Sequence, residues 1–373
     1  VAGDRSGPDV VYGIRGSGQA LSVEWDRHRL AAAGPWQFES SGQSMSLTGF
    51  RMRGPGTDLF WDVESDATGR LKGEGGGVID ADLARMVVDG LERAEGPIAV
   101  DVGVSGTVGA PDWSVRAALA GVTVQGDWFP HPVEDVHGIV ELRPDQTRFR
   151  RFDFQGADAG WLARQPLLRS HLSELAKHDG LHGVLGDGTA VAKGGFTAKN
   201  WIPQQWDIEG EVAGARVQFI EELPPTKGDA SLSFTGPASE ALLAGSIDVT
   251  EMLFTDRITW EEWMLEFTDE EAVDLQLDDA DPLFAMDIVL RSDNTIQVRN
   301  NVGDLTAGGE LRIVGDTVEP GLVGSVVAVP GGRMHLKERE FELTRGEILY
   351  VDPNTFDPQL DLVLNTEVRS RED

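Results

Sequence analysis

The sequence contains no cysteine, so disulfide bonds and thiolate metal sites are excluded. It has no run of apolar residues that approaches the length of about 18 needed for a membrane-spanning helix. Basic residues are few, because 32 Lys and Arg stand against 63 Asp and Glu, a formal net charge of -31. Such a charge repels phosphate backbones and anionic bilayers, so we expect no nucleic-acid partner.

The first residues, VAGDRSGPDV, include no methionine, no basic leader and no apolar targeting segment. We therefore expect the chain to be part of a longer protein, with any membrane anchor outside these 373 residues. Hydrophobic residues make up 40% of the chain, enough for a sizeable core. Glycine is abundant, at 45 residues, which favours turns and close backbone approaches over long helices.

Apolar and polar residues alternate along much of the chain, a period of two that is typical of strands with one apolar and one wet face. In the segment LFAMDIVLRS, every second residue from Phe284 to Leu290 is apolar. Amphipathic hairpins of similar pattern recur at 102–119, 231–249 and 309–329. Because antiparallel sheets tolerate a solvated face, the pattern predicts a mainly antiparallel, all-β protein.

Two segments, 80–96 and 161–180, instead have apolar residues at helical spacing, and we expect short helices that cap or cross the sheet. The glycine-rich segment 69–78 lacks the lysine and hydroxyl of a phosphate loop and predicts a flexible turn. These interruptions suggest four segments: 1–79, 80–160, 161–182 and 183–373.

The sequence has no nucleophile elbow, phosphate-binding loop or dinucleotide-binding motif, and we expect no enzyme, catalytic residue or cofactor. The nearest approach to a metal motif is HPVEDVH, but its strand-like continuation argues against the helix that a zinc protease requires. Three later histidines lie near the end of a predicted helix, where a solvent-facing position is the simpler interpretation. The residues concerned are His131, Glu134 and His137, and then His171, His178 and His182.

Acidic segments at 269–282 and 352–361 invite a calcium interpretation, but neither has the ligand spacing of an EF-hand loop. We expect solvated strand faces and loops at both. Trp260, Glu262 and Trp263 leave two alternatives, a core tryptophan or an aromatic contact with sugar or lipid, and the core position is the simpler one.

The end of the chain carries a resemblance to a known family. Residues 309–369 combine a strand with Gly315 and Pro320, the segments GLVGSVVAVPGGRMHL and REFELTRGEI, and the pattern P-x-L-D-L that begins at Pro358. This stretch resembles the C-terminal region of the TamB family of bacterial envelope proteins. Residues 94–125 and 132–160 are similar to the repeating units of the same family.

The resemblance implies an elongated antiparallel sheet curled into an open apolar groove, anchored in the inner membrane and reaching across the periplasm. It implies conduction of phospholipid between the two membranes, with acyl chains in the groove. The alternative is a scaffold for outer-membrane protein and autotransporter assembly with an Omp85-type barrel partner, TamA. A β-solenoid enzyme acting on polysaccharide is a weaker alternative, because no carboxylate pair stands out.

The strand phase then predicts which side chains face the groove, because a slip of one residue would turn charged neighbours inward. If two walls closed on each other as a dry sandwich, the same residues would form an ordinary core. They are Leu232, Phe234, Ile247, Val249, Phe284, Met286, Ile288, Leu290, Leu311, Ile313, Phe341, Leu343, Leu360, Leu362 and Leu364.

Overall fold

In the computed structural model, the described part of the chain is 71% strand and 7% helix, which confirms the all-β prediction. The chain divides into two compact units: unit 1 is Val1–Val184 with Val191–Gln204, and unit 2 is Leu185–Ala190 with Gln205–Asp373. The predicted division into four segments stays a prediction. The structure describes residues 2–4, 13–18, 21–25, 28–41, 44–86, 90–126, 129, 131–218, 224–257, 282–336, 339–353 and 358–366.

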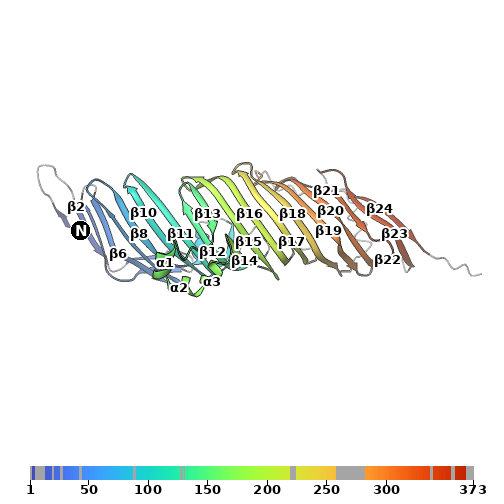
Figure 1. Ribbon diagram of the computed structural model, residues 1–373, viewed down its shortest axis with the longest axis horizontal. Coiled ribbons are helices and arrows are strands. Elements are labelled where there is room, and N and C mark those ends of the chain that lie inside the picture. The colour runs from blue at the N-terminus through green and yellow to red at the C-terminus, as the bar shows by residue number, and fades with distance from the viewer. Residues whose placement is uncertain are drawn as a thin grey trace, which may run out of the picture. The chain divides into compact units, whose positions relative to one another are not determined.

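Unit 1 is a sheet whose main strands pair antiparallel in the order β2, β5, β6, β7, β8, β10, β11, β12, β13 (Figure 1). Most neighbours are adjacent in the sequence, so short turns connect them. The strands are β1 Ala2–Asp4, β2 Gly13–Gly18, β3 Ser22–Trp25, β4 His28–Ala32, β5 Trp36–Ser41, β6 Ser44–Gly54, β7 Thr57–Ser65, β8 Leu71–Asp80, β9 Leu91–Glu95, β10 Pro97–Thr107, β11 Ala110–Gly126, β12 Val133–Arg143 and β13 Gln146–Arg150.

Unit 2 is also a sheet, with strands paired in the order β16, β17, β18, β19, β20, β21, β23, β24. Three strands have residues in both units: β14 Leu181–Leu185, β15 Gly188–Lys199 and β16 Ile202–Val217. The others are β17 Thr226–Pro237, β18 Leu242–Phe254, β19 Ala285–Arg299, β20 Gly303–Asp316, β21 Pro320–Ala328, β22 Arg333–Leu336, β23 Arg339–Tyr350 and β24 Gln359–Asn365.

One strand pair departs from the expected antiparallel arrangement, because β18 and β19 run parallel. Their register aligns Leu243 with Met286 and Ile247 with Leu290. A parallel pair needs a connection of a dozen or more residues, and the long segment between Phe254 and Ala285 supplies it. The sheet is therefore mixed, and the elongated groove remains a prediction.

Both predicted helices are wrong in extent. The first is a short 3-10 helix, η1 Ala81–Met86, followed by strand β9, which pairs with β11. The sheet ladder overrides the local helical pattern there. The second segment is broken into α1 Ala159–Arg164, α2 Pro166–Ser170 and α3 Leu172–Leu175. Gln165 is extended between the first two, because a residue that precedes proline disfavours the helical conformation.

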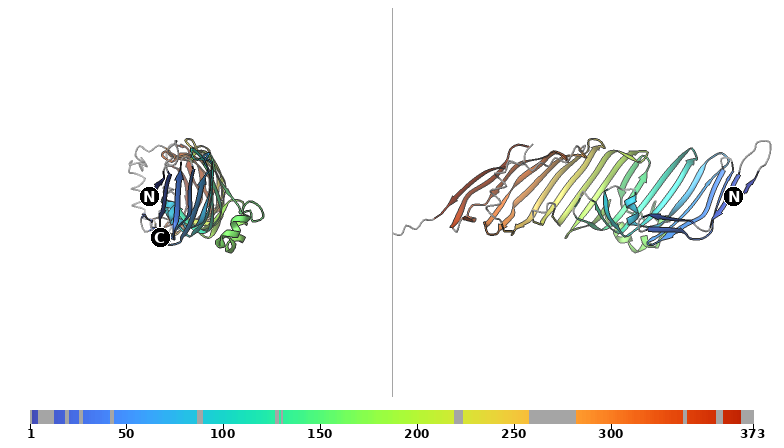
Figure 2. Two further views of the ribbon diagram at one scale, coloured as in Figure 1. Left: turned by 90° about the vertical axis from the view of Figure 1, so that its left-hand side faces the viewer. Right: turned by 180° about the vertical axis from the view of Figure 1, so that it is seen from behind.

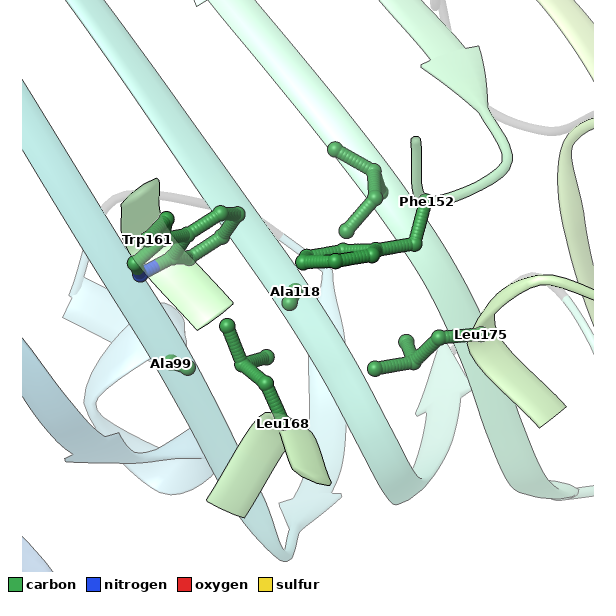
Figure 3. Packing of buried hydrophobic residues seen from close by; sticks show 7 residues of the cluster. Ala99, Ala118, Phe152, Trp161, Leu168 and Leu175 are labelled. Atoms are coloured by element: carbon green, nitrogen blue, oxygen red, sulfur yellow. The ribbon is translucent and has the colours of Figure 1, made fainter. Parts of the chain in front are cut away.

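The three α-helices cover one face of β10, β11 and β12 in unit 1 (Figure 2). Ala99, Ala118 and Ile139 lie side by side across these strands and are fully buried. Trp161, Leu168 and Leu175 pack onto them, one from each helix, together with Phe152 (Figure 3). The two alanines leave room for large helical side chains, so both sides of this contact are buried as in a closed core.

A buried ion network fixes the start of α1 to the sheet. Asp158 has no exposed surface, and it accepts hydrogen bonds from Arg116 at 2.9 Å, from Arg150 at 2.6 Å and from the Asp153 N–H at 2.8 Å. Burial alone would raise the pKa of Asp158, but the hydrogen bonds and the two guanidinium charges outweigh it and lower that pKa. Arg116 also lies over the ring of Trp161, 5.2 Å from its centroid.

Candidate functional site

The fifteen residues predicted to line a groove lie together in unit 2. Partners in neighbouring strands share a face of a sheet. The register aligns Ala230 of β17 with Ile247 of β18, which aligns with Leu290 of β19 and then Leu311 of β20. An apolar row therefore crosses four strands on one face, which we call the unit 2 apolar face.

The remaining predicted residues of β17 to β20 follow the same register. Phe234 aligns with Leu243 and so with Met286, while Ile288 aligns with Ile313. Leu232 and Val249 keep the strand phase of Phe234 and Ile247. Phe284 lies just before β19, and its ring meets that of Phe234 edge to face at 5.5 Å between centroids.

The last strands extend the unit 2 apolar face. Leu360 aligns with Ile348, Leu362 with Gly346, and Leu364 with Leu343 across β23 and β24. Phe341 shares the strand phase of Leu343 and pairs with Met334 of β22. The structure thus brings all fifteen predicted side chains to one face of one sheet.

Most of these side chains are only half-buried. Just two of the fifteen are buried, Ile288 with 6% of its surface exposed and Leu343 with 1%. Leu360 and Leu362 are exposed, at 44% and 49%. A dry sandwich requires that the side chains of both facing layers are fully buried. On the unit 2 apolar face, only these two of the fifteen predicted positions meet that requirement.

The opposite face of unit 2 is charged. Arg312 donates two hydrogen bonds of 2.6 Å to the carboxylate of Asp287 on the adjacent strand, and Arg291 pairs with Glu310 at 3.0 Å. The hydrogen bond from Arg312 lowers the pKa of Asp287. These pairs are partly exposed to solvent, so they make this face wettable and add little to stability.

Unit 1 carries a similar face, which is not among the surfaces predicted from the sequence. In β7, β8 and β10, Trp61 aligns with Gly75 and then Val102, and Leu59 aligns with Gly77. A cavity of about 270 Å³ lies over these strands. We call this surface the unit 1 apolar face: Phe50, Met52, Leu59, Trp61, Val100, Val102 and Val115.

The predicted glycine-rich turn at 69–78 is wrong, because most of the segment belongs to strand β8. Its glycines make room for aromatic rings instead. A Cβ on Gly75 would lie 2.0 Å from the Trp61 ring, which stacks on Trp113 at 5.9 Å between centroids. The missing side chain of Gly75 thus lets Trp61 lie over the strand, in contact with Trp113.

The signal for the unit 1 apolar face was present in the sequence. Phe50 and Met52 alternate with arginines, and Leu59, Trp61 and Val63 alternate around acidic residues. The glycines of β8 interrupt the apolar pattern between these strands. A glycine has no side chain, so it does not indicate which face of the strand is apolar. The sequence therefore does not show which residues of β7 and β10 share a face.

The histidines are placed differently from the prediction. His171, His178 and His182 are half-buried and gather with His137, and the His182 side chain is only 10% exposed. The segment that holds His137 is strand β12, as the argument against a metalloprotease helix requires. In the described part of the chain, no group of three or more His, Asp or Glu side chains is arranged to hold a metal ion.

Several other predictions cannot be followed in the structure. Trp260, Glu262 and Trp263 lie outside the described residues, as does nearly all of the acidic segment 269–282 and part of 352–361. Among the helices of the described residues, none has both the length and the apolar character needed to cross a membrane.

The repeated amphipathic strands define a class, a β-sheet protein whose apolar faces are its most distinctive surfaces. The sequence profile of the TamB C-terminal domain matches residues 179–373, a little more than half of the chain. The chain belongs to the TamB family. Comparisons with curated proteins and with solved structures gave no significant match.

Family membership places the protein among the translocation and assembly modules of the cell envelope, a family of assembly and transport modules rather than enzymes. The matched residues include the whole unit 2 apolar face. The unit 1 apolar face lies outside the match.

Proposed function

We propose that the apolar faces of this protein hold the acyl chains of phospholipids and conduct them between the inner and outer membranes. The observation that carries the proposal is the register of unit 2, which gathers fifteen apolar residues on one face while burying two of them. Such a face leaves a large apolar surface half in contact with water, which marks a binding surface in a soluble protein.

The energetics suit a conduit. Each methylene that leaves water gains about 0.8 kcal/mol, and this gain has no preferred direction. An acyl chain on a uniform apolar face therefore binds without specific polar contacts and meets no large barrier to sliding. No catalytic group is needed, because the lipid is moved and not chemically changed.

The charged residues of unit 2 support an orientation in which the acyl chains lie on the apolar face and the headgroups stay in water. Arg312, Asp287, Arg291 and Glu310 occupy the opposite face of unit 2 and offer an acyl chain no favourable contact. The net charge of -31 also disfavours an anionic headgroup along the body of the protein. We expect headgroups to remain in water while the chains lie on the apolar face.

The second candidate function is assembly of outer-membrane proteins with a TamA-type barrel partner. One observation favours it: strand β24 exposes Leu360, Leu362 and Val363, so both of its faces present apolar surface. A client strand would add to an exposed strand through backbone hydrogen bonds. The two candidates differ in what the protein binds.

Purification of the full chain, followed by mass spectrometry of the hydrophobic molecules that it retains, tests the proposal. We expect co-purified phospholipid, and less of it in the variant Ile247→Asp. The control Asp248→Asn changes the neighbouring residue, which has the opposite strand phase and is exposed. Absence of lipid together with binding of an unfolded outer-membrane barrel would reject the conduit and favour the assembly scaffold.

A further inference from the structure

Unit 1 contains four histidines in mutual contact, which we call the histidine cluster: His137, His171, His178 and His182. They come from distant parts of the sequence, since His137 lies on β12, His171 between α2 and α3, His178 after α3, and His182 on β14. The rings of His137 and His182 stack at 5.6 Å between centroids, and those of His178 and His182 lie 4.5 Å apart. The cluster thus joins the helices to the sheet.

The contact between His137 and His171 requires a neutral ring. Nδ1 of His137 lies 2.8 Å from the carbonyl oxygen of Asp135, which can only accept, so Nδ1 carries the proton. Nε2 of the neutral His137 ring then has a lone pair, and it accepts a hydrogen bond from Nδ1 of His171 at 3.2 Å. If only one of the two rings gains a proton, the other still offers a lone pair and the bond persists with its direction reversed. Protonation of both rings sets two N–H donors against each other and removes the bond.

His182 is equally unsuited to a charge in the folded protein. Its side chain is 10% exposed, and neither ring nitrogen has a hydrogen-bond partner among the residues that the structure describes. Burial, followed by the charges of His178 and His137, lowers the pKa of His182 below its ordinary value. Glu174 opposes this effect, but its carboxylate is 3.6 Å from Nε2.

The surrounding charges do not balance a protonated cluster. Within the described ranges, two acidic groups face it, Asp135 from β12 and Glu174 from α3, and Asp135 is 65% exposed. Glu174 already pairs with Lys177 at 3.4 Å. Asp179, in the loop after α3, is exposed to solvent, and Lys193 of β15 packs beside the same loop. Four added protons would therefore exceed the nearby negative charge.

We propose that the histidine cluster is a pH-sensitive latch that holds α2 and α3 on the sheet at neutral pH and releases them in mildly acidic solution. Protonation of both His137 and His171 removes the bond between them, and charges on neighbouring rings of the cluster repel each other. Release uncovers the apolar residues Ala99, Ala118 and Ile139 on β10 to β12. The pH then controls whether the helices cover this face, independently of lipid binding.

The sign of the effect follows from proton linkage. The pKa of His182 is lower in the folded protein than in an opened state, so the opened state binds the proton more tightly. Opening is then favoured as the pH falls below about 6.5, the ordinary histidine value, and the effect saturates below the lowered pKa. Above pH 6.5 both states are neutral and the latch is closed.

Hydrogen–deuterium exchange of the full chain at pH 7.5 and 5.5, corrected for intrinsic exchange rates, tests the latch. We expect peptides from 161–182 to lose protection several-fold at the lower pH, while peptides from β6 and β7 do not change. The variant His182→Phe keeps a buried ring that cannot be charged, and we expect it to retain protection at pH 5.5. His178→Gln supplies a second variant in case His182→Phe fails to fold at pH 7.5.

The matched control is His335→Gln in unit 2, whose side chain is 51% exposed. It should leave the pH response of 161–182 as in the parent chain. The latch is wrong if protection of 161–182 is the same at both pH values, or if the cluster variants respond as the parent does. A pH response that disappears when a chelator is added would also reject the latch, since it would reveal a bound metal.

Discussion

The helix-covered face of unit 1 and the unit 2 apolar face are both apolar, yet they differ in how completely other side chains cover them. Ala99, Ala118 and Ile139 have no exposed surface, because Trp161 and Leu168 close over them. On the unit 2 apolar face only two of fifteen side chains are buried. Apolar alternation in a sequence therefore does not distinguish a closed core from an open binding surface. The two are distinguished by whether other elements cover the strands.

The largest expected effect comes from a charge placed in the closed core. Ile139→Asp buries a carboxylate with no partner between the sheet and the helices, and we expect unit 1 to lose about 4 kcal/mol or more. Denaturant unfolding followed by tryptophan fluorescence measures this loss. A stability close to that of the parent chain would mean that the helices do not close this face.

Asp158→Asn tests the ion network that fixes α1. The substitution removes the buried negative charge that the half-buried guanidinium groups of Arg116 and Arg150 share, and we expect a loss of about 3–5 kcal/mol. Unfolding at pH 7 measures it. Asp287→Asn, in a solvent-exposed pair, is the matched control and should change stability little.

The same network predicts a dependence on acid. The pKa of Asp158 is lower in the folded than in the unfolded chain, so its contribution is complete above about pH 4 and is lost as the pH falls below that value. The difference in stability between the parent and Asp158→Asn should shrink between pH 4 and pH 2. A difference that stays constant over that range would contradict a charged Asp158. The histidine latch acts at higher pH, so the two effects separate.

The strands and most of the apolar face could be predicted from alternation alone, as Ile247, Leu290 and Leu311 illustrate. The parallel pairing of β18 with β19 could not, because strand direction depends on a connection and leaves no periodic signal. Neither could the histidine cluster, because His137 and His171 meet only after the helices fold back onto β12. Strand β9 could not be predicted, because its residues have helical spacing and only the ladder with β11 makes them a strand.

A smaller effect is expected at the glycine strand of unit 1. Gly75→Val places a side chain against the ring of Trp61 and should cost about 1–3 kcal/mol through overpacking. Gly109→Val is the control, because a Cβ there would meet no atom of the described residues within 4 Å, its chain neighbours aside. Equal stabilities for the two variants would show that Trp61 does not lie over β8.

The smallest effect on stability should come from a charge on the open face. Ile247 is half-buried, so Ile247→Asp leaves the carboxylate partly hydrated, and we expect a loss of about 1 kcal/mol. Set beside Ile139→Asp in the same unfolding assay, it gives the contrast between the two faces directly. A loss as large as that of Ile139→Asp would identify the unit 2 apolar face as a closed core.

The central claim is that acyl chains lie on the unit 2 apolar face, and site-specific photo-crosslinking tests it most directly. A photoreactive phenylalanine analogue replaces Ile247 in one variant and Asp248 in another, two neighbours of opposite strand phase. After irradiation in cells, we predict phospholipid adducts at position 247 and few or none at 248. Equal adducts at both positions, or none at 247, would contradict the account.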